Sequence, residues 1–242
     1  MGKQSLTRIS FSLLITGFFI ISLGGCSDDE VIPSKADLYA GFFPLHQGSW
    51  IAYDADSIVH LEDDDVYSVD TSISAYHFQV KEQVDSAFVD AVGELTYRIS
   101  RYRRLSDTLN WDFMNVWTAK RTLSSAQRVE DNIRYVKMAF PIDKRKLWNG
   151  NAYNMFTPEE YSYSGIYSSL AIGGFQFDST VTVVQNDFTS NINRILKKEI
   201  YSNHIGMVYK QRDSLNTVNL PSGSVLILNG FEYKLTVNSY AQ

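Results

Sequence analysis

Residues 231–240 read FEYKLTVNSY, and large apolar side chains alternate with polar ones through Asn238. Four of these apolar residues fall on one face of an extended chain: Phe231, Tyr233, Leu235 and Val237. Because successive side chains of a β-strand point to opposite faces of the sheet, this period of two predicts a half-buried antiparallel strand.

The same period recurs along much of the chain. In residues 93–102, Leu95, Tyr97 and Ile99 alternate with charged and hydroxyl side chains. Further strands are predicted at 50–60, 72–84, 111–117, 127–130, 133–140, 177–185, 194–201 and 205–212. Turn-forming residues separate these segments, so we predict an all-β fold whose antiparallel sheets form a sandwich or a curved half-barrel.

We expect at most one or two short helices. The best start signal is residues 157–160, TPEE. Thr157 is suited to cap a helix, Pro158 to the first helical position, and Glu160 to complete a capping box. A short helix is therefore predicted from Pro158.

The N-terminal segment has the pattern of an export signal. Lys3 and Arg8 precede an apolar run of 15 residues, 9–23, which ends at Gly24 and Gly25. A positive start, an apolar middle and small residues at the end are typical of a signal peptide. The run is shorter than the roughly 20 residues of a membrane-spanning helix. We therefore predict that residues 1–25 are removed.

Residues 23–26, LGGC, resemble the lipobox of bacterial lipoproteins, and Cys26 is the only cysteine in the chain. The resemblance implies cleavage before Cys26 and lipid on its sulfur. A lone thiol in an exported chain has no disulfide partner, which also favours lipidation. Since each buried CH₂ contributes about 0.8 kcal/mol, a doubly acylated cysteine would hold the protein firmly at a membrane.

Residues 27–30, SDDE, follow the cysteine directly. This run resembles the export signal of surface lipoproteins of the Bacteroidota type, which implies an outer-membrane or cell-surface location in the envelope. An alternative is a flexible acidic tether, and an aspartate at this place marks inner-membrane retention in other bacterial groups.

We expect residues 26–38 to be an acidic tether and residues 39–242 to be a single β-rich domain, because no Pro/Gly/Ser-rich linker divides them. Loss of Lys3 and Arg8 with the signal peptide takes the formal net charge from −5 to −7. The pI of about 5.4 does not suit a nucleic-acid partner.

Two further segments resemble exported lipoproteins of the same group. Residues 42–53, FFPLHQGSWIAY, are similar to the opening of many such domains, and residues 199–210, EIYSNHIGMVYK, to a hairpin near their end. Ser202 and His204 depart from the usual small residues. The resemblance implies a β-rich lipoprotein domain and carries over no catalytic residue.

Catalytic motifs are scarce in this sequence. The chain has neither a G-x-S-x-G nor an S-x-x-K motif, and Cys26 is assigned to lipid. A catalytic Ser/His/Asp triad can have any spacing in the sequence, so it is not excluded. Because no catalytic motif supports it, a hydrolase ranks last among the predicted functions. We expect no cofactor.

Metal-binding motifs are weak. The four histidines lie apart in the sequence, although His60 and His77 could face each other across a hairpin. Asp63, Asp64 and Asp65 are candidate oxygen ligands for Ca²⁺, but they lack the spacing of a known calcium loop. The alternative, a solvated hairpin loop, is favoured.

The segment 148–167 holds one Trp, four Tyr and one Phe among Asn, Ser and Gly. Rings with a polar tip suit sugars and partner proteins, so we predict an exposed contact surface, with the alternative that the rings belong to the core. Its candidate residues are Trp148, Tyr153, Tyr161, Tyr163 and Tyr167. The predicted function is a non-enzymatic binding module for a glycan, a lipid or an envelope protein; the alternative is a structural or assembly subunit.

Overall fold

The computed structural model describes Gly2, Tyr39, residues 41–61 and residues 72–242. All of these except Gly2 belong to one unit, Pro33–Gln242. Cys26, the acidic run 27–30 and the calcium candidates Asp63, Asp64 and Asp65 lie outside the described residues. Within the described part, no helix is long and apolar enough to cross a membrane.

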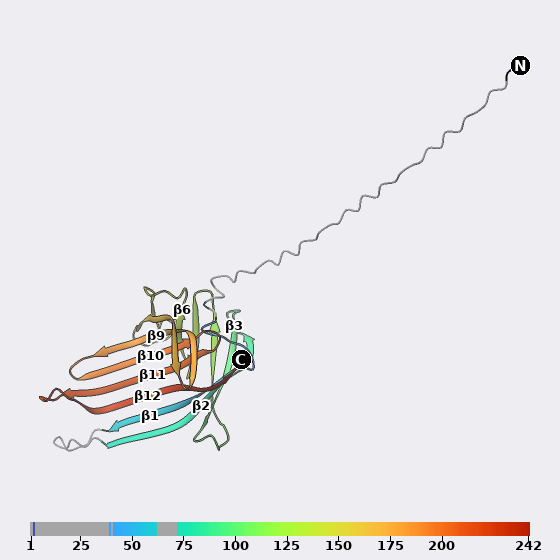
Figure 1. Cartoon of the computed structure of the whole chain (residues 1–242). Coiled ribbons are helices and arrows are strands. Elements are labelled where there is room, and N and C mark those ends of the chain that lie inside the picture. The colour runs from blue at the N-terminus through green and yellow to red at the C-terminus, as the bar shows by residue number, and fades with distance from the viewer. Residues whose placement is uncertain (1, 3–38, 40, 62–71) are drawn as a thin grey trace. The chain divides into compact units, whose positions relative to one another are not determined.

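The described part of the chain forms one antiparallel sheet of twelve strands (Figure 1). Their bounds are β1 (Trp50–Leu61), β2 (Ser72–Val89), β3 (Leu95–Arg104), β4 (Asp112–Arg121), β5 (Ser125–Glu130), β6 (Ile133–Ala139), β7 (Leu147–Asn149), β8 (Glu160–Ile172), β9 (Phe175–Thr189), β10 (Asn193–Ser202), β11 (Gly206–Asn219) and β12 (Val225–Ala241). The all-β antiparallel prediction is confirmed.

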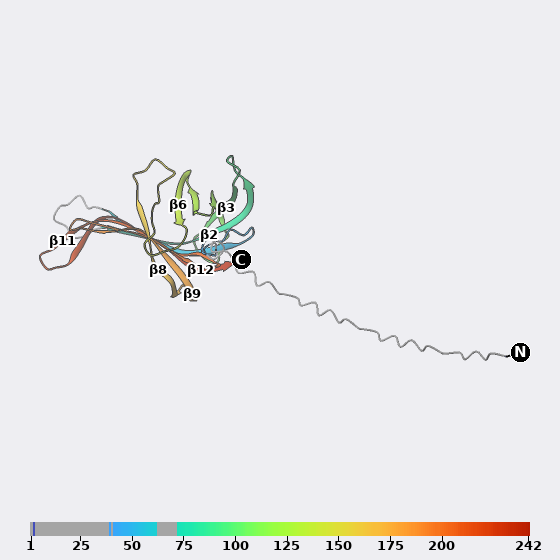
Figure 2. The same ribbon diagram turned by 90° about the horizontal axis from the view of Figure 1, so that it is seen from above.

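The strand order is β6-β5-β4-β3-β2-β1-β12-β11-β10-β9-β8-β7. Every hydrogen-bonded pair except β1–β12 therefore joins strands that are consecutive in the chain. Two meanders, β1–β6 and β7–β12, meet along the β1–β12 pair, which leaves β6 and β7 as the two outer edges. Figure 2 shows β3 and β6 curving out of the plane in which β11 lies.

The curvature brings the two outer edges together. The backbone N–H of Val136 in β6 donates to the carbonyl oxygen of Gly150, just after β7, at 2.9 Å. The sheet is thus nearly closed into a barrel. Of the two predicted architectures, the curved sheet is the one that forms.

The main core fills the concave face. It includes Tyr53, Ile99, Val181 and Val183, each at most 2% exposed, and the segment 42–45 packs against it. The strand predicted at 231–240 lies inside β12, where Leu235 and Val237 are buried. Of the four apolar residues predicted on one face, Leu235 and Val237 are thus buried, whereas Phe231 and Tyr233 are only partly buried.

A second, smaller core contains Phe177, Val208 and Val237. The turn between β8 and β9 reaches it: a Cβ at Gly173 would collide with the carbonyl oxygen of Val237. Gly173 also has a φ of +61°, a conformation that suits glycine. The sequence of this turn therefore allows it to lie directly on β12.

The helix predicted from Pro158 is wrong, because Glu160 begins strand β8. The local capping bonds of a helix are replaced by contacts to a distant segment. The side-chain oxygen of Asn149 accepts the Glu159 N–H at 3.1 Å, and the Gly150 N–H donates to the Glu159 carbonyl at 2.8 Å. These hydrogen bonds hold the backbone of Glu159 extended beside β7. They therefore outweigh the local helix-start signal of residues 157–160.

Candidate functional site

Two of the five predicted contact aromatics, Trp148 and Tyr163, form hydrogen bonds across the seam between the outer edges. The Trp148 indole Nε1 donates to the Val136 carbonyl at 3.0 Å. The Tyr163 hydroxyl accepts the Ala139 N–H at 3.0 Å and donates to the Ala139 carbonyl at 2.9 Å. Side chains thus supply the bonds that a further strand beside β6 would supply.

The predicted exposed surface is therefore wrong for part of this set. Tyr161 and Tyr163 are only 3% and 5% exposed, and the Trp148 ring packs against both. Tyr153 and Tyr167 are exposed, at 58% and 55%. The reason is that an edge strand presents unpaired backbone groups, and buried rings with polar tips can both cover and satisfy them.

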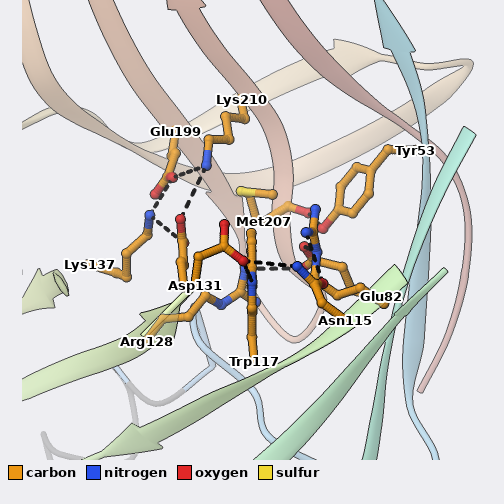
Figure 3. A network of polar contacts seen from close by, with 12 residues as sticks. Tyr53, Glu82, Asn115, Trp117, Arg128, Asp131, Lys137, Glu199, Met207 and Lys210 are labelled. Carbon is orange, nitrogen blue, oxygen red and sulfur yellow. Dashed lines mark hydrogen bonds and ion pairs between the residues drawn. The ribbon is translucent and has the colours of Figure 1, made fainter. Parts of the chain in front are cut away.

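A network of charged side chains joins strands of the two meanders (Figure 3). Its first group centres on Glu82 of β2, which is 6% exposed. Arg101 donates to one carboxylate oxygen at 3.1 Å, and Arg128 donates to the other at 3.0 Å. The Arg101 guanidinium also lies over the ring of Trp117, 3.6 Å from its centroid.

The second group joins the two meanders. Lys137 of β6 lies between Glu199 of β10, at 2.6 Å, and Glu130 of β5, at 3.0 Å. Lys210 of β11 is 3.4 Å from Glu199 and 3.7 Å from Glu130, and Figure 3 shows both lysines beside the Glu199 carboxylate. The Tyr201 hydroxyl donates to the other oxygen of Glu199 at 2.6 Å.

The charges in this second group stabilise one another. Burial would raise the pKa of Glu199, but the ammonium groups of Lys137 and Lys210 lower it to about 2. Burial acts on Glu130 in the same way, and the same lysines hold its pKa well below the usual range. Burial would lower the pKa of Lys137, yet the two carboxylates raise it. All three groups are therefore charged at neutral pH.

A cavity of about 470 Å³ opens beside this group, and Glu130, Lys137 and Lys210 line part of it. Lys197 and Arg212 extend the positively charged wall. The charged lining residues number four cations and two carboxylates. Six lining residues come from the predicted contact segment: Asn151, Phe156, Thr157, Pro158, Glu159 and Tyr161. Segment 148–167 thus lines a cavity, mostly through residues other than the predicted ones.

Sequence reasoning missed the cationic wall. Lys137, Lys197, Lys210 and Arg212 lie on three strands, and no local motif connects them. The available signal is weak: Lys210 and Arg212 are two residues apart, so in a strand their side chains share a face.

The described residues contain no group of three or more His, Cys, Asp or Glu side chains that could hold a metal ion. His60 forms a hydrogen bond with Glu232 at 3.0 Å, and His77 forms one with Asp56 at 2.9 Å. In the β1–β2 register His60 lies opposite Ile73, so the two histidines do not face each other.

Comparisons with solved structures give distant likenesses. The chain is similar to a crystal structure from Parabacteroides distasonis ATCC 8503, described as a "putative lipoprotein". The TM-score is 0.41 at 9% identity, over 83% of this chain and 98% of that chain. No protein-family profile matches the chain. No curated protein is similar to it either.

Proposed function

We propose that the protein is a lipid-anchored lipoprotein of the cell envelope, and that its barrel-like domain is a non-enzymatic binding module. The binding site of the proposal is the cavity lined by Lys197, Lys210 and Arg212. The observation that carries it is this cavity of about 470 Å³, whose size falls within the usual range for small-molecule sites.

The ion pairs behind the cavity support binding over acid–base chemistry. A general acid or base works best when its pKa lies near the operating pH. Here the pKa of Glu130 is lowered and that of Lys137 is raised, so both shifts favour the charged forms. Fixed charges that do not exchange protons suit a preorganised binding site.

Thermal-shift screening of the mature protein against soluble glycans and small metabolites tests the binding proposal. A ligand of the cavity should raise the melting temperature of the wild type but not of a Thr157→Trp variant, since the indole would occupy space beside this exposed lining residue. Thr108→Trp, on an exposed turn away from the cavity, is the matched control. Ligands that stabilise all three proteins equally would refute the assignment of the cavity.

The anchor is tested separately. The proposal expects Cys26→Ala to leave the precursor uncleaved or to release the protein from membranes, because the acyl chains are attached through this sulfur. Membrane fractionation and metabolic labelling with a fatty acid measure both effects. A variant that fractionates and labels like the wild type would contradict lipidation at Cys26.

A further inference from the structure

We infer that the cavity recognises a small anionic ligand through a carboxylate or phosphate group, held by Gln185, Lys197, Lys210 and Arg212. This inference rests on the proposed function and adds the chemical class of the ligand. Three independent features carry it: the cross-strand charge pattern, the pairing of the cations and an unpartnered buried donor.

The charge pattern changes along strands β10 and β11. Glu199 and Lys210 are direct cross-strand partners of opposite sign, whereas the next pair on the same face is Lys197 opposite Arg212. Like charges directly opposite each other destabilise a sheet. An anion bound between Lys197 and Arg212 would remove this repulsion.

The cations of the cavity differ in how well protein groups neutralise them. Lys197 donates to Glu159 at 2.7 Å. Among the described residues, the ion pairs include none to Arg212, whose guanidinium lies 5.5 Å from the Phe231 ring centroid. Arg212 is exposed and lines the cavity. A planar fork of donors without a carboxylate partner is suited to bidentate binding of a carboxylate or phosphate.

The third feature is Gln185, which lines the cavity and is 9% exposed. Its Nε2 has no hydrogen-bond partner among the described residues. The β9–β10 register pairs Lys197 with Asn186 and Lys198 with Val184, so Gln185 is the unpaired residue of a bulge. Bulges re-aim side chains beside functional sites. A ligand oxygen at this amide would satisfy the buried donor.

Together these residues present donors and positive charge from three adjacent strands. The lining carries four cations and two carboxylates, and Glu199 behind it adds a third carboxylate; the remaining positive charge favours an anion over a neutral ligand or a cation. Exposed Phe156 adds an apolar face at the same cavity, where the non-ionic part of the ligand would lie.

Isothermal titration of the mature protein in detergent with D-glucuronate, inorganic phosphate and D-glucose tests this inference. Glucuronate and glucose share a ring and differ in the acid, so we expect the acid to bind about tenfold more tightly or better, with an affinity that falls as salt rises. Comparison of phosphate with glucuronate separates the two anion classes.

Two variants localise the effect. Arg212→Gln should weaken acid binding by about tenfold, whereas Arg145→Gln, at a 92% exposed side chain outside the cavity, should not change it. Gln185→Leu keeps much of the side-chain volume and removes the unpartnered donor. We expect it to keep or raise thermal stability while it weakens acid binding, a combination that a purely structural role would not produce.

Equal binding of glucose and glucuronate that is lost in Thr157→Trp would overturn the anionic assignment and leave the binding module intact. Failure of glucuronate and phosphate to bind at millimolar concentration would also overturn it. The proposed function falls only if the wider ligand panel fails as well, so the two failures can be distinguished.

Discussion

On strands β10 and β11, two neighbouring cross-strand pairs carry opposite arrangements of charge. Glu199 and Lys210 attract each other, and Glu199 is fully buried while Lys210 reaches the wall of the cavity. Lys197 and Arg212, one step along the same face, have the same sign and line the cavity. The contrast teaches that opposite charges in the inner pair stabilise each other, whereas in the outer pair only Lys197 has a protein carboxylate partner, Glu159, and Arg212 is the cation proposed to meet a ligand.

The largest effect is expected at the inner group. Lys137→Met leaves Glu130 and Glu199 with Lys210 as their main remaining cation. Removal of one partner from a buried ion pair costs about 3–5 kcal/mol, so the free energy of unfolding should fall by that amount. Urea unfolding measures it, with exposed Lys144→Met as the control. A loss below about 1 kcal/mol would mean that this group does not stabilise the closed sheet.

The pH dependence of stability tests the same buried ion pairs. The folded-state pKa of Glu199 is about 2, below its ordinary value of 4.5, so its ionised form stabilises the fold. That stabilisation is complete above pH 4.5 and is lost as the pH falls toward 2. In Lys137→Met, protonation instead removes an uncompensated buried charge. The stability gap between wild type and variant should therefore narrow in acid, as urea titrations at several pH values would show; a constant gap would contradict the charge argument.

Loss of an uncharged hydrogen-bonding group across the seam should lower the stability less. Tyr163→Phe removes the hydroxyl that bonds both backbone groups of Ala139 and leaves a buried N–H without its partner. The expected loss is about 1–3 kcal/mol. Tyr167→Phe, at an exposed ring, is the matched control. Equal effects of the two substitutions in chemical denaturation would show that the Tyr163 hydroxyl does not close the seam.

The smallest effect on stability is expected at the outer pair. Arg212→Gln removes one of two facing cations, so the free energy of unfolding should change by less than about 0.5 kcal/mol or rise slightly. Thermal denaturation without ligand measures it. A fall in the free energy of unfolding of more than about 1 kcal/mol would mean that Arg212 stabilises the fold as the inner pair does. The proposed difference between the two pairs would then be wrong.

The strands were predictable because alternation is a local property. Residues 93–102 and 231–240 lie largely within β3 and β12. Segment 160–172 lacks a clear period of two, and this strand was missed. Its backbone bends where Gly165 and Tyr167 take positive φ angles and the register to β9 shifts. The apolar neighbours that share a face with Trp50 and Trp117 also predict that both are buried, which is confirmed for Trp117, 8% exposed, but wrong for Trp50, which is only partly buried beside Lys81.

The sequence by itself determined the all-β class, because side-chain alternation and turn residues act within a few neighbouring positions. It also supplied the prediction of a lipidated Cys26. Only the tertiary structure decided which charged side chains lie inside. Lys137 and Glu199 are 62 residues apart and come within 2.6 Å because the curved sheet closes on itself. Burial of a charged side chain is costly unless a group of opposite charge lies beside it. Closure of the sheet determines which group that is.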